Sequence, residues 1–235
     1  MPGYFITGTD TGVGKTFVTA LMANLLQRQG RKAAVYKPIE TGGKFERQRY
    51  VSNDMEFVKN LAKLPQPVTE MNTYCLREAV SPSLAAELEN KTINLDLILT
   101  HFNKLQANYD WVLVEGAGGI CVPVSGTEIL ISDLIKLLNL PVIVVARPNL
   151  GTINHTVLTV KYAQSMGLVV KGVIINYTQR KAATVVEKTN PRYIADITGV
   201  PVLGIIPYMD ADERVGKFSA PEQYLNCEKI FKVSK

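Results

Sequence analysis

The chain has 235 residues, of which 46% are hydrophobic and 20% are charged, a composition typical of a folded globular protein. Its 26 basic and 21 acidic residues leave a net charge of +5, and the cations form no run and no helix face. This charge favours a small anionic ligand and argues against a nucleic-acid surface. The N-terminus does not resemble a signal peptide, and no apolar run is long enough to span a membrane.

Six short apolar runs, rich in valine and isoleucine, predict the strands of one sheet. They do not alternate with polar residues, which is typical of parallel strands that are covered on both faces. The runs are YFIT (4–7), AAVY (33–36), WVLV (111–114), VIVVA (142–146), GVIIN (172–176) and VLGII (202–206).

Segments with helical periodicity lie between these runs. One follows the first run and ends near Gly30, another follows the N-cap residue Asn94, and a third follows Thr152. We therefore expect one doubly wound α/β domain over residues 1–235, with a mainly parallel sheet and helices on both faces. The interval of about seventy residues between the second and third runs is an insertion, which usually carries function or covers an edge.

The first run is followed by GTDTGVGKT (8–16), which differs from the common phosphate-binding loop by one residue. The common loop has four residues between its first glycine and Gly-Lys-Ser/Thr, whereas this chain has five. Gly12 and Gly14 permit backbone conformations that turn N–H groups toward an anion, at the positive end of the next helix. Lys15 is expected to reach the terminal phosphates and Thr16 to bind Mg²⁺. The alternative is a glycine-rich turn with a chance Gly-Lys-Thr.

Charged residues also end the second and third runs. Ligands of open α/β sheets bind outside the carboxyl ends of the strands, so these residues should converge. Glu115 would need a cation partner if buried, and we expect it beside the metal unless it caps the turn that follows it. Lys37 is expected to be a second cation for the phosphates rather than a solvated lysine. Asp54 opens a helical segment, where a carboxylate is favourable whether or not it binds a metal.

Together these segments resemble the dethiobiotin synthase family. The resemblance rests on GTDTGVGKT (8–16), YKPIETG (36–42), SND (52–54), SPSLAA (81–86), WVLVEGAGG (111–119), LGTINH (150–155) and the strand end at Asn176. They occur in family order over nearly the whole chain, and the family's own phosphate loop contains the extra residue. Gly12 and Thr41 stand where some members carry Glu and Ser, and the C-terminal residues match least.

The resemblance implies an ATP-dependent enzyme that converts 7,8-diaminopelargonate and CO₂ to dethiobiotin in biotin biosynthesis, releasing ADP and phosphate. One substrate amine carries CO₂ as a carbamate, whose oxygen attacks the γ-phosphorus of ATP. The neighbouring amine then captures the resulting anhydride and closes the ureido ring. Mg²⁺ and a homodimer with a shared substrate site are also implied, with neither a nucleic acid nor a membrane as partner. The three cysteines have no metal-ligand or disulfide spacing, which predicts free thiols in a cytoplasmic protein.

The resemblance also implies roles for the residues at matching positions. The catalytic residues would be Lys37, Lys15 and Thr11. Nucleotide and metal would be bound by Gly12, Val13, Gly14, Lys15, Thr16, Phe17, Asp54, Glu115, Gly116, Ala117, Gly118, Asn176 and Pro207, with Thr16, Asp54 and Glu115 on Mg²⁺. The substrate would be bound by Thr11, Lys37, Thr41, Gly151, Thr152 and Asn154, the last three at a helix N-terminus that receives the distant carboxylate across the dimer interface.

Three other classes of protein are alternatives. A partition or septum-site ATPase has a similar fold, but that family places a lysine five residues before the loop lysine, where this chain has Asp10. It also tends to show DNA-binding or membrane-binding segments, which are not evident here. A cobyrinate synthase of the amidotransferase type needs a further glutaminase domain. A nucleotide-binding regulator would need neither two lysines nor two metal carboxylates in one crevice.

Overall fold

The computed structural model describes residues 2–46, 48–179, 184–210 and 220–231, and its centre is one parallel sheet. The strands of this sheet are β1 (Gly3–Gly8), β2 (Ala33–Thr41), β5 (Asn72–Leu76), β6 (Trp111–Gly119), β9 (Val142–Ala146), β10 (Val170–Asn176) and β11 (Val202–Ile206). They form a seven-stranded sheet in the order β11-β10-β9-β1-β6-β2-β5, and every neighbouring pair is parallel. All six predicted runs lie in it, so the predicted doubly wound fold is confirmed.

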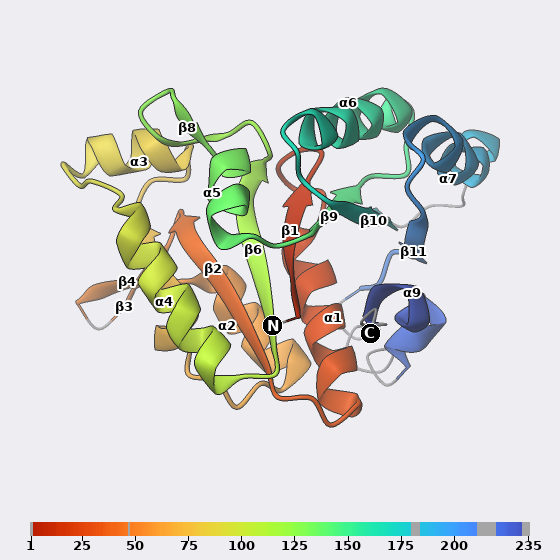
Figure 1. Cartoon of the computed structure of the whole chain (residues 1–235). Coiled ribbons are helices and arrows are strands. Elements are labelled where there is room, and N and C mark those ends of the chain that lie inside the picture. The colour runs from red at the N-terminus through yellow and green to blue at the C-terminus, as the bar shows by residue number, and fades with distance from the viewer. Residues whose placement is uncertain (1, 47, 180–183, 211–219, 232–235) are drawn as a thin grey trace.

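The strand β1 lies at the point where the direction of winding changes. It pairs with β6 on one side and with β9 on the other, and Phe5 lies opposite Val114 and Val142 in the two ladders. In Figure 1 the arrowheads of β1 and β2 point to the same edge of the sheet. Because all seven strands are parallel, the loops that follow them meet at that edge, where doubly wound proteins bind ligands.

The strand β5 was not predicted, and it belongs to the long insertion after β2. It forms the edge of the sheet, with Asn72 opposite Lys37 and Leu76 opposite Thr41. An edge strand is only half covered, and four of its five residues are partly exposed, so no apolar run marks it. The insertion therefore covers an edge of the sheet, as expected. Its other elements are the hairpin β3 (Lys44–Glu46) and β4 (Arg49–Val51), α2 (Asn53–Ala62), η1 (Val68–Glu70), α3 (Pro82–Leu88) and α4 (Leu95–Asn108).

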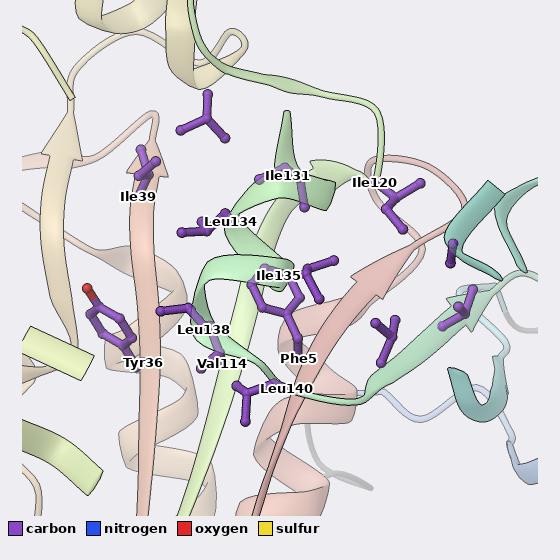
Figure 2. Packing of buried hydrophobic residues seen from close by; sticks show 14 of the residues in the cluster. Phe5, Tyr36, Ile39, Val114, Ile120, Ile131, Leu134, Ile135, Leu138 and Leu140 are labelled. Atoms are coloured by element: carbon purple, nitrogen blue, oxygen red, sulfur yellow. The ribbon is translucent and has the colours of Figure 1, made fainter. Parts of the chain in front are cut away.

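Helices cover both faces of the sheet over two separate cores. Along β1, Phe5 packs into one core, whereas Tyr4 and Ile6 pack into the other. The first core is covered by α3, α4, α5 (Ile131–Leu138), α6 (Thr152–Ser165) and α7 (Val185–Thr198). The second is covered by α1 (Lys15–Arg28), α2 and α9 (Cys227–Phe231). Figure 2 shows the first core, with Leu134 and Ile135 of α5 lying against the sheet near Phe5.

The predicted helix ends have local causes. Asn94 caps α4, since its Oδ1 accepts the backbone N–H of Asp96 at 2.8 Å and that of Leu97 at 3.2 Å. The helix α1 ends at Arg28, just before Gly30, whose φ of 70° is a left-handed conformation suited to glycine. The helix α6 begins at Thr152. These boundaries agree with the sequence prediction.

The remaining elements are short. They are β7 (Pro123–Ser125) and β8 (Ile129–Leu130), which pair antiparallel between β6 and α5, and η2 (Pro221–Gln223) before α9. Within the described ranges, no helix combines the length and the apolar character that a bilayer crossing requires. The three cysteines are free, as predicted.

Candidate nucleotide and metal site

The loop between β1 and α1 has the conformation of an anion-binding turn. Gly12 has a φ of 73° and Gly14 a φ of 92°, a region that residues with a Cβ rarely adopt. Gly14 is the N-cap of α1, and no side chain of the described residues caps this helix end. The first backbone N–H groups of α1 are therefore offered to a ligand, together with the positive end of the helix dipole.

A cluster of opposite charges lies at the C-terminal ends of β2 and β6. The Nζ of Lys37 lies 3.2 Å from Oε1 of Glu115 and also contacts Oδ2 of Asp54. The hydroxyl of Thr16, from the second residue of α1, donates to the same Oε1 of Glu115 at 2.8 Å. Four elements, α1, β2, α2 and β6, thus bring together the three expected metal ligands and the second lysine.

Burial and neighbouring charges act differently on the two lysines of the site. Burial lowers the pKa of Lys15, the charge of Lys37 lowers it further, and Glu115 and Asp54 oppose this. For Lys37, which is 6% exposed, burial also disfavours the charge. However, Glu115, Asp54 and Glu40 outweigh burial and raise its pKa above the ordinary value. The charged form of Lys37 is therefore favoured by its neighbours, whereas an approaching anion would favour the charged form of Lys15.

One carboxylate oxygen of the cluster is buried without a partner among the described residues. Glu115 is 1% exposed, and its Oε2 makes no hydrogen bond. A buried carboxylate oxygen without a partner is costly. A divalent cation beside Glu115, Asp54 and Thr16 would satisfy this oxygen, and carboxylate and hydroxyl oxygens are the ligands that Mg²⁺ prefers. The donor set fits Mg²⁺, although the described residues contain no group of three or more His, Cys, Asp or Glu placed to hold a metal.

Asn176 reaches the loop from the end of β10. Its Nδ2 donates to the backbone oxygen of Val13 at 2.9 Å, whereas its Oδ1 is buried with no partner in the described structure. A Cβ at Gly14 would lie 2.1 Å from Nδ2, so only glycine leaves room for this contact. The amide is therefore fixed against the loop and leaves one acceptor for a ligand. Pro207 follows the neighbouring strand β11 and is exposed.

The tip of the loop is held by Arg147, a residue that we did not predict. Its Nη2 donates to the backbone oxygen of Thr11 at 2.8 Å and lies 3.2 Å from Oδ2 of Asp10. The Oδ1 of Asp10 accepts the N–H of Thr11 at 2.7 Å. Arg147 directly follows the fourth apolar run, and this position at a strand end was a signal available in the sequence.

The glycines at the end of β6 lie against the loop and the core. A Cβ at Gly118, whose φ is 65°, would lie 3.6 Å from Oγ1 of Thr11, so this strand end reaches the loop tip. A Cβ at Gly116 would lie 2.8 Å from the ring of Phe5. Gly116 is thus required by packing. Thr41 ends β2 and is partly buried.

The helix end expected to bind a carboxylate is formed as predicted. Gly151 is the N-cap of α6 with a φ of 93°, and within the described part of the chain no side chain caps this end. Thr152 is buried and Asn154 is exposed. The N–H of Thr152 donates to the backbone oxygen of Asn149 at 3.1 Å, so an anion here would be bound by the N–H groups that follow it in the first turn.

Two solved structures share the doubly wound, P-loop NTPase-like fold of this chain. A ParA family ATPase from Chlorobium tepidum matches with a TM-score of 0.56 at 15% identity, covering 99% of this chain and 93% of that one. The MinC:MinD cell division complex of Aquifex aeolicus matches with a TM-score of 0.55 at 19% identity, covering 92% of this chain and 86% of that one. At such identities, the likeness is one of fold.

Sequence relatives identify the family of the chain. A family model described as an AAA domain matches residues 2–214. The chain is 45% identical over 212 residues to the ATP-dependent dethiobiotin synthetase BioD of Anoxybacillus flavithermus, covering 89% of this chain and 93% of the relative. It is 42% identical over 207 residues to the BioD of Bacillus subtilis strain 168, covering 88% and 87%. The chain belongs to the dethiobiotin synthetase family, an ATP-dependent enzyme family, which confirms the resemblance.

Proposed function

We propose that the chain catalyses the ATP-dependent closure of 7,8-diaminopelargonate and CO₂ to dethiobiotin, with release of ADP and phosphate. The observation that carries this proposal is the convergence of Lys15, Thr16, Lys37, Asp54 and Glu115 at one edge of the sheet. A phosphate loop alone would serve any nucleotide-dependent protein. Lys37 adds a second buried cation beside two carboxylates, which suits a reaction in which a carbamate anion attacks a phosphoryl group.

The two lysines would act on opposite sides of the transferred phosphoryl group. Lys15 and the first N–H groups of α1 would bind the β- and γ-phosphates of ATP. Lys37 would stabilise negative charge on the carbamate and on the γ-phosphoryl group as the carbamate oxygen attacks phosphorus and ADP leaves. The neighbouring amine then attacks the carbonyl carbon of the mixed anhydride, and phosphate departs as the ring closes. The proton that the attacking amine loses leaves with the phosphate, as HPO₄²⁻.

Different residues would bind the Mg²⁺ ion and the adenine base. Thr16, Asp54 and Glu115 would hold Mg²⁺, which neutralises phosphate charge when it is bound. The unpartnered Oδ1 of Asn176 would accept a hydrogen bond from the amino group of adenine, beside the backbone at Pro207. The loop amides of Gly12, Val13 and Phe17, and the strand end at Gly116, Ala117 and Gly118, complete the proposed nucleotide site.

The diamine would lie between the loop tip and β2. Thr11 and Thr41 would line its path near Lys37. Its distant carboxylate would reach the N-terminus of α6, at Gly151, Thr152 and Asn154, in the second subunit of a homodimer. We place this reaction in the cytoplasm, a location that suits free cysteines.

A phosphate-release assay in which each reactant is omitted in turn tests this function. We expect release only when ATP, Mg²⁺, the diamine and bicarbonate are all present, and dethiobiotin should be detected by mass spectrometry in equal amount. Phosphate release that ignores the diamine would instead support an ATPase of the partition or septum-site type. Lys37→Ala provides the inactive control, and Lys104→Ala, at an exposed position on α4, is the matched variant.

A further inference from the structure

A third carboxylate, that of Glu40, is buried next to the charge cluster and has no part in the reaction described above. Glu40 lies near the C-terminal end of β2 and is only 3% exposed. Its charge acts on Lys37, together with those of Asp54 and Glu115. Burying a carboxylate without hydrogen-bond partners costs free energy. The partners of Glu40 therefore indicate its role.

Both oxygens of Glu40 contact the first turn of α2. Oε2 accepts the hydroxyl of Ser52, and Oε1 accepts the backbone N–H of Asp54 at 3.2 Å. Ser52 is the N-cap of α2, and its own Oγ accepts the N–H of Met55 at 3.0 Å. Glu40 therefore holds the capping residue of the helix and also satisfies one of the free N–H groups at the helix N-terminus.

This arrangement fixes the residue that carries the outermost carboxylate of the cluster. Asp54 is the second residue of α2. Its side chain is 40% exposed and contacts Lys37 on the solvent-exposed side of the site. A further hydrogen bond, from Nδ2 of Asn53 to the backbone oxygen of Gly42 at 3.4 Å, also ties this turn to the end of β2. Each oxygen of Glu40 accepts a hydrogen bond from this turn, whereas Oε2 of Glu115 has no partner among the described residues, so Glu115 is better placed than Glu40 to bind a metal directly.

We propose that Glu40 is a positioning residue, which holds the first turn of α2 so that the Asp54 carboxylate binds Mg²⁺ together with Glu115. This inference rests on the proposed metal role of Asp54. Residues that orient a metal ligand by hydrogen bonds typically change metal affinity by ten- to a hundredfold when they are replaced. Glu40→Ala should therefore raise the Mg²⁺ concentration needed for half-maximal nucleotide binding by about tenfold.

Mg²⁺ titrations of the full chain with a fluorescent ATP analogue, without the diamine, test this inference. Glu40→Gln keeps an acceptor for the Asp54 N–H and loses the acceptor for Ser52, so its shift should be smaller than that of Glu40→Ala. The matched control is Glu56→Gln, which changes another carboxylate in the first turn of α2 and should leave the titration unchanged. In an Asp54→Ala background, Glu40→Ala should add no further shift, because Glu40 acts through Asp54.

The outcomes separate this inference from the metal role on which it rests. A shift for Asp54→Ala with none for either Glu40 variant overturns the inference alone, and so does an additive shift in the double variant. No shift for Asp54→Ala overturns the metal role as well. Thermal unfolding of each variant is measured in parallel, and a lowered Tm with an unchanged Mg²⁺ titration assigns Glu40 to stability only. If Glu40→Ala does not fold, Glu40→Gln decides.

Discussion

The Lys37 ammonium contacts the two carboxylates that we propose as Mg²⁺ ligands, so one side chain bridges β6 and α2. Without a metal, this cation balances the buried charge of Glu115. A metal between the same carboxylates would repel the ammonium and leave it to interact with the phosphoryl group and the carbamate. The same residue would then serve the stability of the free protein and the charge of the transition state.

Lys37→Met separates these two contributions. Turnover should fall by at least about a hundredfold, because charge stabilisation is lost, while nucleotide binding through Lys15 is largely retained. Without Mg²⁺, the free energy of unfolding should fall by about 3 kcal/mol, because the change leaves Glu115 as an uncompensated buried charge. This is the lower end of the usual cost of breaking a buried ion pair, since the Asp54 side chain is partly exposed to water. Urea unfolding should show that Mg²⁺ recovers part of this loss.

The control for this change is Lys104→Met, which removes an exposed lysine from α4. It should alter neither turnover nor stability measurably. Near-normal phosphate release by Lys37→Met would refute the role of Lys37 in the reaction. If Mg²⁺ does not reduce the loss of stability, the idea that Lys37 and the metal interact with the same two carboxylates is refuted.

Glu115→Gln removes one charge from the proposed metal site and keeps the shape of the side chain. We expect nucleotide affinity in the presence of Mg²⁺ to fall about tenfold or more, because Glu115 is the buried member of the ligand set. Affinity measured without Mg²⁺ should change far less. Nucleotide titrations with and without Mg²⁺ check this, with Glu128→Gln at an exposed position as control. An unchanged Mg²⁺ requirement would exclude Glu115 as a ligand.

The sequence revealed those site residues that directly follow apolar runs. Glu115 and Lys37 were found in this way, because parallel strands end at a common edge. Asp54 was assigned only through the family resemblance, since its own surroundings also suit an ordinary helix N-terminus. Arg147 was missed although it directly follows the fourth apolar run, since its partners Asp10 and Thr11 could not be known from that position alone. Glu40 was missed because its role depends on contacts with the first turn of another element, which no local pattern encodes.

At the scale of elements, the two ends of α1 carry glycines with different constraints. Gly14 has no room for a Cβ, which would meet the Asn176 amide at 2.1 Å, whereas a Cβ at Gly30 would meet nothing within 4 Å. Both have positive φ, so alanine at either position should lose about 1–2 kcal/mol of stability from backbone strain. Gly14→Ala should in addition displace Asn176 from Val13 and nearly abolish nucleotide binding.

Isothermal titration with ATP and Mg²⁺, combined with urea unfolding, distinguishes these two contributions. Gly30→Ala serves as the matched control, since it introduces the same strain at the far end of the same helix. Its nucleotide affinity should equal that of the unchanged protein. Equal affinities for Gly14→Ala and Gly30→Ala would show that the loop does not need the Asn176 contact.

Element prediction succeeded where one residue or a short run determines the outcome. Asn94 and Gly30 marked helix ends through capping and left-handed geometry, and six buried strands were visible as apolar runs. The strand β5 was missed because a half-covered edge strand has no such run. Its place in the sheet is set by pairing with β2, a contact between segments that are far apart in the sequence.

At the scale of the whole molecule, the C-terminal helix α9 lies away from the proposed site. The C-terminal thirty residues match the family least, and contacts to the base were left open there; residues 211–219 and 232–235 of this stretch lie outside the described residues. Phe231 of α9 packs edge-on against Trp111 at a ring distance of 5.4 Å, and the Tyr4 hydroxyl contacts the backbone oxygen of Ile230. Trp111 is the first residue of β6 and Tyr4 the second of β1, so α9 covers the strand ends opposite the phosphate loop. No sequence pattern specified this docking, because it depends on the assembled sheet.

If the chain forms the proposed homodimer, part of the surface of α6 should be buried between the two subunits. Leu158 of this helix is 61% exposed, and Leu150, just before it, is 86% exposed, although both are large apolar side chains. If the N-terminus of α6 completes the substrate site of a second subunit, these side chains should be buried between the subunits. An aspartate at Leu158 would then place a charge in an apolar interface, which is strongly unfavourable.

Leu158→Asp should therefore convert the dimer to monomers and abolish turnover, while nucleotide binding, which lies within one chain, persists. Sedimentation velocity and nucleotide titration measure these two properties on the same sample. Phe45→Asp, at a 62% exposed ring on the β3–β4 hairpin, is the control and should leave the dimer intact. Figure 1 shows this hairpin and α6 at opposite sides of the sheet. A monomeric but fully active Leu158→Asp enzyme would contradict the shared site, because turnover would then need no residue from a partner.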